Sequence, residues 1–196
     1  AETLELVTMV YAGLLNKKIV AQLQSCSCNA FGLCGADGNL IRAKKRSVQP
    51  IDFGFVGDQE LVYAQLLITL LSENLTPVIA PITHNGQGQL LNTNADTIAQ
   101  TIASAMSQNF QVHLVFAFEK KGVLSDINNR ESRIEQLSSQ DIEARKLSGT
   151  IHNGMLPKLS AGFQALEDGV DRVCVGSALE LDKIIANNKL ATQLIK

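Results

Sequence analysis

The chain has 196 residues, of which 45% are hydrophobic and 18% are charged, and its formal net charge is -2. This composition supplies enough apolar material for one domain or for two lobes that share a sheet, and it excludes a disordered chain. A net charge near zero gives no electrostatic basis for binding nucleic acid or an anionic membrane. The basic run Lys44-Lys45-Arg46 is short and typical of a solvated hairpin face.

No apolar stretch approaches the roughly 18 residues that cross a bilayer. The N-terminal segment is acidic and amphipathic, unlike a signal peptide. Cys26 and Cys28 form a C-x-C pair without a second matching pair, and Cys34 and Cys174 stand alone. We therefore predict no metal site and interpret the four cysteines as reduced thiols, which favours a cytoplasmic location.

The first predicted element is a helix over residues 3–24, because apolar residues recur there with a period near 3.6. The stripe consists of Leu4, Val7, Tyr11, Leu14, Leu15, Ile19 and Leu23. It is wide enough to bury more than one side of the helix. A partner subunit, as in a homodimer, is one explanation, and a piece of chain absent from this sequence is another.

The next elements are a strand over 29–34, an Asp-Gly turn at 35–38 and a returning strand over 40–46. Further along, the pattern predicts helices at 60–72, 96–106, 139–147 (capped by Ser139), 157–168 and 178–186. Strands are predicted at 77–82, 89–91, 112–118, 172–175 and 194–195. Residues 125–133 are polar and form a surface loop. This alternation predicts an α/β fold of three αβα layers around a mainly parallel open sheet.

Two amides and a carboxylate crowd the first strand-to-helix junction, at Asn92, Asn94 and Asp96. Amide groups and helix N–H groups there are suited to an anionic ligand. Capping of the helix by Asn94 or Asp96 explains the same residues equally well, and the sequence leaves both interpretations open.

A second junction follows at residues 152–158, where a glycine-containing loop leads into a helix that carries Lys158 in its first turn. Backbone donors together with one cation suit a phosphoryl group, although an exposed lysine beside a helix start is the simpler interpretation. There is no Walker A sequence, and Gly86-Gln87-Gly88 does not continue into a dinucleotide fingerprint. The histidines His84, His113 and His152 lack metal-like spacing.

In their order and spacing, several segments together resemble the amino acid kinase family across nearly the whole chain. The residues that carry the resemblance are Val10 to Gly13, Asn16-Lys17, Gly32 to Leu40, Gly54 to Gly57, Pro77 to Pro81, Leu91 to Thr97, Gly122 to Leu124, Gly154-Met155 and Pro157-Lys158. The resemblance implies transfer of the γ-phosphoryl group of ATP, with Mg²⁺, to the side-chain carboxylate of an N-acylated glutamate.

By the same resemblance, residues 1–108 form the lobe that binds the acylated amino acid and residues 109–196 form the nucleotide lobe. Asn92 and Asn94 are expected to bind the substrate, Lys158 to stabilise the transferred phosphoryl group, and Asp96 to organise the catalytic lysines. The nucleotide site is expected to contain Glu119, Lys120, Lys121, Gly122, Val123, Leu124, Thr150, Ile151 and His152.

The sequence departs from the family pattern in three places. The initial Lys-x-Gly-Gly strand, the His-Gly-Gly-Gly loop and an Arg-bearing hairpin are not present, so we expect an N-terminally incomplete fold. Glu119-Lys120-Lys121 replaces an Asp-containing run, and Ala191-Thr192 stands where Gly-Thr is common. Three alternatives stay open: a succinylated acceptor, another substrate such as carbamate, aspartate or free glutamate, and a non-catalytic binding or assembly subunit.

Overall fold

The computed structural model describes residues 2–126, 128–147, 154–186 and 190–196. The chain divides into two compact units, Ala1–Ile98 and Ala99–Lys196. The dividing point lies within helix α4 (Ala95–Met106), so the boundary that we expected at residue 108 falls just beyond the end of this helix.

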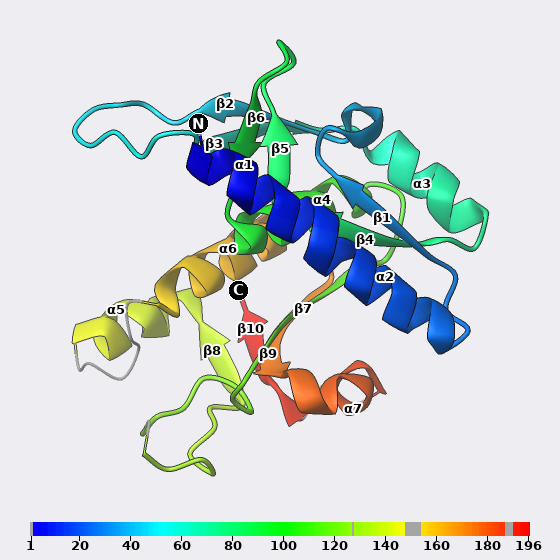
Figure 1. Cartoon of the computed structure of the whole chain (residues 1–196). Coiled ribbons are helices and arrows are strands. Elements are labelled where there is room, and N and C mark those ends of the chain that lie inside the picture. The colour runs from blue at the N-terminus through cyan, green and yellow to red at the C-terminus, as the bar shows by residue number, and fades with distance from the viewer. Residues whose placement is uncertain (1, 127, 148–153, 187–189) are drawn as a thin grey trace. The chain divides into compact units, whose positions relative to one another are not determined.

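The first unit begins with one long helical segment, shown in blue in Figure 1. It consists of α1 (Glu2–Thr8), the π-helical stretch η1 (Met9–Leu15) and α2 (Asn16–Ser25). The helix predicted over residues 3–24 is therefore confirmed, with a π-helical middle that its apolar periodicity did not indicate. Such π-helical turns are uncommon inside helices.

Helix α2 packs on a pair of parallel strands, β1 (Ala30–Cys34) and β4 (Thr76–Ala80). Asn16 fixes this contact, because its buried Nδ2 donates to Val78 O at 2.8 Å and to Leu33 O at 3.4 Å. Gly32 makes room for it, since a Cβ on Gly32 would lie 2.1 Å from Asn16 Oδ1. An amide side chain thus joins the helix to both strands.

A second sheet of this unit has the strand order β3-β2-β5-β6. Its strands are β2 (Ile41–Lys45), β3 (Gly57–Val62), β5 (Ile82–His84) and β6 (Leu90–Asn92), and the short helix η2 (Asp37–Asn39) and α3 (Ala64–Ser72) complete the unit.

Two expectations about this region are wrong. Strand β2 does not return along β1; it pairs antiparallel with β3, whereas β1 pairs with β4. The helix predicted over 60–72 begins only at Ala64, because Leu61 and Val62 pair with Arg42 and Ile41 of β2. Pairing with a neighbouring strand outweighs the local helical pattern.

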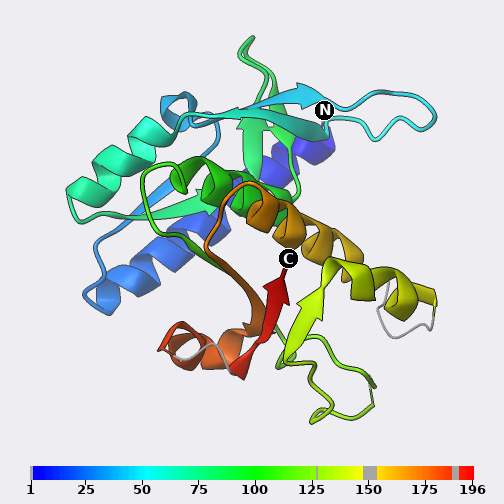
Figure 2. The same ribbon diagram turned by 180° about the vertical axis from the view of Figure 1, so that it is seen from behind.

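The second unit contains one four-stranded sheet with the order β7-β9-β10-β8. In Figure 2 the red strand β10 lies beside the yellow-green strand β8. The strands are β7 (His113–Phe118), β8 (Gln136–Ser138), β9 (Arg172–Ser177) and β10 (Thr192–Ile195). The helices are α5 (Ser139–Leu147), α6 (Leu156–Glu167), the short η3 (Ala178–Glu180) and α7 (Leu181–Ala186).

Helices cover both faces of this sheet. On one face Phe163 of α6 belongs to a core cluster with Phe116 and Val173. On the other face Ile184 of α7 packs with Cys174. Neighbouring residues of β9 thus point to opposite faces, as the geometry of a strand requires, and burial on both sides explains its continuous apolar sequence.

The α/β class is confirmed, and the sheets are mixed, with more parallel than antiparallel pairings. Among the described strands, four pairings are parallel and three are antiparallel.

Strand β8 was not predicted. The cap of α5 is Ser138 rather than Ser139, since Ser138 Oγ accepts a hydrogen bond from Asp141 N. No helix among the described residues is long and apolar enough to cross a membrane.

Candidate functional site

The first candidate site is a cavity of about 310 Å³ in the first unit. Asn92, at the end of β6, is its main polar side chain, and α1 together with the segment 53–56 supplies the other walls. The lining residues are Thr3, Leu4, Val7, Phe53, Gly54, Phe55, Val56 and Asn92. The cavity is therefore largely apolar with one amide, a lining that holds a small organic ligand in one orientation.

The backbone around Asn92 is held by contacts on several sides. Asn92 N donates to Phe55 O at 2.8 Å, and Thr93 N donates to Pro81 O at 3.0 Å. The hydroxyls of Thr93 and Thr83, both buried, lie 2.8 Å apart. Asn92 therefore presents its side chain from a rigid strand end rather than from a loose loop.

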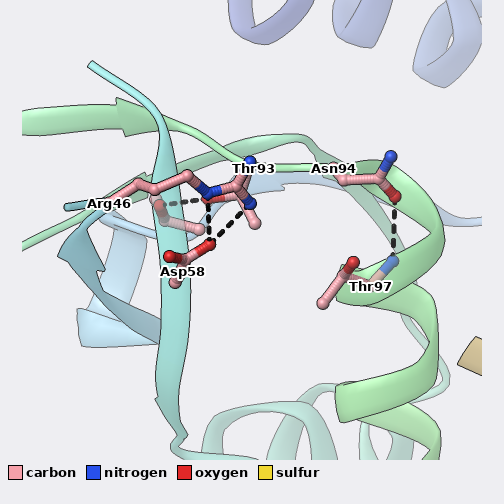
Figure 3. A network of polar contacts seen from close by, with 6 residues as sticks. Arg46, Asp58, Thr93, Asn94 and Thr97 are labelled. Carbon is pink, nitrogen blue, oxygen red and sulfur yellow. Dashed lines mark hydrogen bonds and ion pairs between the residues drawn. The ribbon is translucent and has the colours of Figure 1, made fainter. Parts of the chain in front are cut away.

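Positive charge lies beside the aromatic walls of this cavity. Lys45 Nζ lies 5.1 Å from the centre of the Phe55 ring, and Arg46 lies 5.5 Å from that of Phe53. Arg46 also pairs with Asp58 at 2.6 Å, as Figure 3 shows, and the hydrogen bond with this carboxylate raises the pKa of the guanidinium. Cations above aromatic faces are stabilised by the ring quadrupole.

Asn94 caps helix α4, as one of the two interpretations of this junction predicted. Its Oδ1 accepts from Asp96 N at 2.8 Å and from Thr97 N at 3.1 Å, and Figure 3 shows the second of these bonds. Two of the N–H groups that begin the helix are therefore occupied by the protein itself. Asp96 lies half-buried in the first turn, where a carboxylate is favoured by the helix dipole.

The second junction is the start of α6 in the second unit. Pro157 lies in the first turn, as predicted, and Met155 makes no side-chain cap hydrogen bond with the described residues. Lys158 is half-buried, and its Nζ lies 5.1 Å from the centre of the Phe116 ring. Thr150, Ile151 and His152, which we expected at the nucleotide site, lie outside the described residues.

A larger cavity, of about 680 Å³, lies in the second unit. It is placed where β7 and β9 end, and these strands are parallel neighbours, so their carboxyl ends meet at one edge of the sheet. This is where open α/β sheets bind ligands. The lining residues are Glu119, Lys120, Lys121, Leu124, Arg130, Ser177, Leu179 and Glu180.

Four of the residues predicted for a nucleotide line this cavity: Glu119, Lys120, Lys121 and Leu124. Val123, which belongs to the same predicted group, is instead 3% exposed and packs in the hydrophobic core. Lys121 Nζ contacts Glu131 at 2.7 Å, and this hydrogen bond lowers the pKa of the Glu131 carboxyl. The mouth of the cavity thus carries charged groups of both signs.

Sequence reasoning missed Arg130, Ser177, Leu179 and Glu180. Ser177 ends β9 and caps η3, with its Oγ accepting from Leu179 N at 3.3 Å, and the Leu179 side chain is 92% exposed. The rule that ligands bind where parallel strands end would have pointed to Ser177. Arg130 had no such signal, because it lies in the polar loop 125–133.

Metal-ligating clusters are not found in the part of the chain that the structure describes: no three His, Cys, Asp or Glu side chains there are arranged to hold an ion. All four cysteines are free thiols, and burial raises the pKa of Cys34 and of Cys174. A raised pKa keeps a thiol protonated and unreactive, so neither cysteine has the character of a nucleophile.

Comparison with known proteins gives a consistent result. A family model described as the amino acid kinase family matches residues 1–177. A protein named acetylglutamate kinase from Cytophaga hutchinsonii is 49% identical over 197 aligned residues, covering 100% of this chain and 75% of the relative. Another of the same name, from Bacteroides thetaiotaomicron, is 53% identical over 175 residues, covering 89% of this chain and 68% of the relative.

Solved structures show the same fold at low sequence identity. An N-acetylglutamate synthase from Neisseria gonorrhoeae, complexed with coenzyme A and N-acetyl-glutamate, matches with a TM-score of 0.80 and 20% identity. The match covers 100% of this chain and 44% of that structure. At this identity the likeness supports the fold alone.

Proposed function

Because the chain belongs to the amino acid kinase family, we propose that it phosphorylates the side-chain carboxylate of N-acetyl-L-glutamate with ATP, in arginine biosynthesis. The observation that carries this proposal is 49% identity to an acetylglutamate kinase across the full length of this chain. The product of the reaction is an acyl phosphate, and ADP is released.

The chemistry needs no general base. A glutamate-type carboxylate has a pKa of about 4.3 and is already ionised at neutral pH. The obstacle is the repulsion between this anion and the triphosphate, so catalysis depends on positioning and on positive charge. Lys158, in the first turn of α6, is the described cation that we assign to the transferred phosphoryl group.

The two cavities divide the substrates between the units. We assign the 310 Å³ cavity to the acylated amino acid, with Asn92 as a hydrogen-bond donor and Lys45 supplying positive potential. We assign the 680 Å³ cavity to ATP. This division corresponds to the lobes that we expected at residues 1–108 and 109–196.

Asn94 and Asp96 have supporting roles in this proposal. Asn94 uses its Oδ1 as the cap of α4, so only its NH₂ group is assigned to the substrate. Asp96, two residues further along in the first turn of α4, is assigned to orient the catalytic lysines. Both roles depend on α4 beginning at the same place in every molecule, which the cap ensures.

Magnesium enters this scheme as part of the nucleotide. Mg²⁺ keeps several waters and commonly binds through substrate phosphates with few protein ligands. The described residues of the nucleotide cavity agree with this mode, because Glu119 and Glu180 are its only described carboxylates and no cluster of three ligands is formed. When bound with ATP, the ion offsets charge on the phosphates.

The direct test is an ADP-release assay on the enzyme that contains this chain. N-acetyl-L-glutamate and N-succinyl-L-glutamate are supplied in parallel, with free glutamate, aspartate and carbamate as controls. We expect turnover with N-acetyl-L-glutamate and none with the controls. Turnover with the succinyl compound alone would mean that the substrate is N-succinyl-L-glutamate. Turnover with neither compound would refute the proposal.

The apolar surface of the first helical segment supports a homodimer. Between Leu6 and Ile19, seven large apolar side chains are 39–60% exposed in the single chain: Leu6, Met9, Val10, Tyr11, Leu14, Leu15 and Ile19. Exposed large apolar residues concentrated on one helical segment commonly mark a protein–protein interface. Light scattering at micromolar concentration is expected to give twice the chain mass, and Leu14→Glu to shift it to the monomer.

We also assign the enzyme to the cytoplasm, where its proposed substrate ATP is made available and where thiols stay reduced. The four free cysteines support this assignment. Fractionation of the source cells followed by the ADP-release assay is the test, with activity expected in the cytoplasmic fraction.

A further inference from the structure

The segment Glu119–Leu124, called here the nucleotide loop, follows β7 and is linked to β10 by a side chain of that strand. Thr192 of β10 is fully buried, and its Oγ1 accepts a hydrogen bond from Val123 N at 2.9 Å. The same hydroxyl donates to Ile134 O at 2.6 Å. These two bonds, called here the Thr192 bridge, connect three segments of the second unit.

The Thr192 bridge gives the backbone N–H of Val123 a hydrogen-bond acceptor. Val123 O accepts from Ile134 N at 2.8 Å, so the carbonyl side of Val123 has a backbone partner. Its N–H faces the other way, and the Thr192 hydroxyl takes the place of a backbone carbonyl. Since Val123 is only 3% exposed, water does not offer an alternative partner.

Gly122 shows that the approach is close. A Cβ on Gly122 would lie 2.5 Å from Thr192 Oγ1 and 3.0 Å from Arg133 Cγ, and both distances are shorter than ordinary van der Waals contact. Arg133 Nη1 donates in turn to Ala191 O at 2.7 Å, next to Thr192 in the chain. The glycine therefore permits a contact that any other residue would block.

From this geometry we infer that Thr192 is a positioning residue for ATP: its hydroxyl fixes the nucleotide loop so that Glu119, Lys120 and Lys121 face the 680 Å³ cavity before the nucleotide arrives. The inference rests on the proposed function, because it assigns that cavity to ATP. Thr192 is not one of the residues that line the cavity. It acts through the backbone of Val123. A loop that is already ordered loses less entropy when ligand binds.

The test compares Thr192→Val, which removes the hydroxyl at nearly constant shape, with Thr192→Ser, which keeps it. Leaving a buried N–H without a partner is expected to raise KM for ATP about tenfold in Thr192→Val, equivalent to about 1.4 kcal/mol. KM for the acylated amino acid is expected to stay within about twofold, and Thr192→Ser to keep the wild-type KM for ATP. A merely structural role would not affect the two KM values differently.

Two outcomes would overturn the inference: an unchanged KM for ATP in folded Thr192→Val, or an equal rise in both KM values. Should Thr192→Val not fold, hydrogen exchange on the wild-type enzyme answers the same question. If the Thr192 bridge is formed in the free enzyme, the Val123 amide exchanges slowly before any nucleotide is added. Fast exchange that becomes slow only after ATP is added would contradict the inference. An inactive wild-type enzyme would refute the proposed function. The exchange rate of the Val123 amide can still be measured in that enzyme, so it tests the Thr192 bridge independently of activity.

Discussion

The two junctions at the starts of α4 and α6 differ in how their helices begin. At α4 the side chain of Asn94 occupies the N–H groups of Asp96 and Thr97. At α6 the N-cap Met155 makes no side-chain cap hydrogen bond with the described residues, and Lys158 lies in the first turn. Helix α4 satisfies its own donors, whereas α6 combines a lysine with a helix start that its cap residue leaves open.

In the proposed function, this difference suits the two junctions to different anions. A capped helix offers few backbone donors to a ligand, so we propose that the acceptor carboxylate and acyl amide are recognised by side chains such as Asn92. At α6, where Met155 makes no side-chain cap hydrogen bond with the described residues, a helix start with a lysine suits a phosphoryl group, because the helix dipole and the N–H groups both favour negative charge. Changes at α6 should therefore affect catalysis, and changes at α4 should affect substrate binding or stability.

The largest effect is expected from Lys158→Ala. Removing the cation assigned to the transition state should lower kcat about 100-fold or more, with smaller changes in both KM values. Steady-state kinetics measures this, and Lys158→Arg serves as the matched control that keeps the charge but alters its geometry. A kcat near that of the wild type would show that Lys158 has no part in the mechanism. The start of α6 would then not be the phosphoryl-binding junction.

A smaller and more selective effect is expected from Asn92→Asp. This change keeps the shape of the side chain, removes its N–H donor and adds a negative charge to a cavity assigned to an anion. KM for the acylated amino acid should rise roughly 10-fold to 100-fold, the equivalent of a lost hydrogen bond to a charged group. KM for ATP serves as the internal control. If both KM values rise together, Asn92 does not distinguish the substrates.

The smallest effect is expected from Asn94, the residue that caps α4. Asn94→Ala removes the cap of α4 and should lower the free energy of unfolding by about 1 kcal/mol, whereas Asn94→Ser keeps a capping oxygen and should retain most of it. Denaturant unfolding measures both. Asn94→Ser also lacks the NH₂ group, so a raised KM for the acylated amino acid in this variant separates substrate binding from capping. An Asn94→Ala variant as stable as the wild type would show that the cap is not needed.

The local pattern predicted most of the helices, and the reasons are local too. The apolar period over residues 3–24 and Pro157 at the start of α6 depend only on residues that are neighbours along the chain. The predicted nucleotide residues Glu119, Lys120, Lys121 and Leu124 also line one cavity. These came from the family resemblance rather than from the chemistry of the residues.

The expectations that were wrong concern pairing between distant segments. Glu60 to Val62 read as the start of a helix, but β2 provides a partner strand and takes them into β3. Strand β8, only three residues long, exists because β10 lies beside it. Neither partner is visible in a local window of sequence, since strand pairing depends on segments far apart in the chain.

The α/β class, the positions of the main helices and the family could be predicted from the sequence, because apolar periodicity, turn residues and motif spacing are properties of the chain order. The cap that Asn94 gives α4 and the bond between the Thr192 hydroxyl and the Val123 N–H emerged only from the folded structure. A buried polar group must find a partner wherever the fold brings one. Thr192 and Val123 are 69 residues apart in sequence, so their contact exists only once the sheet has formed.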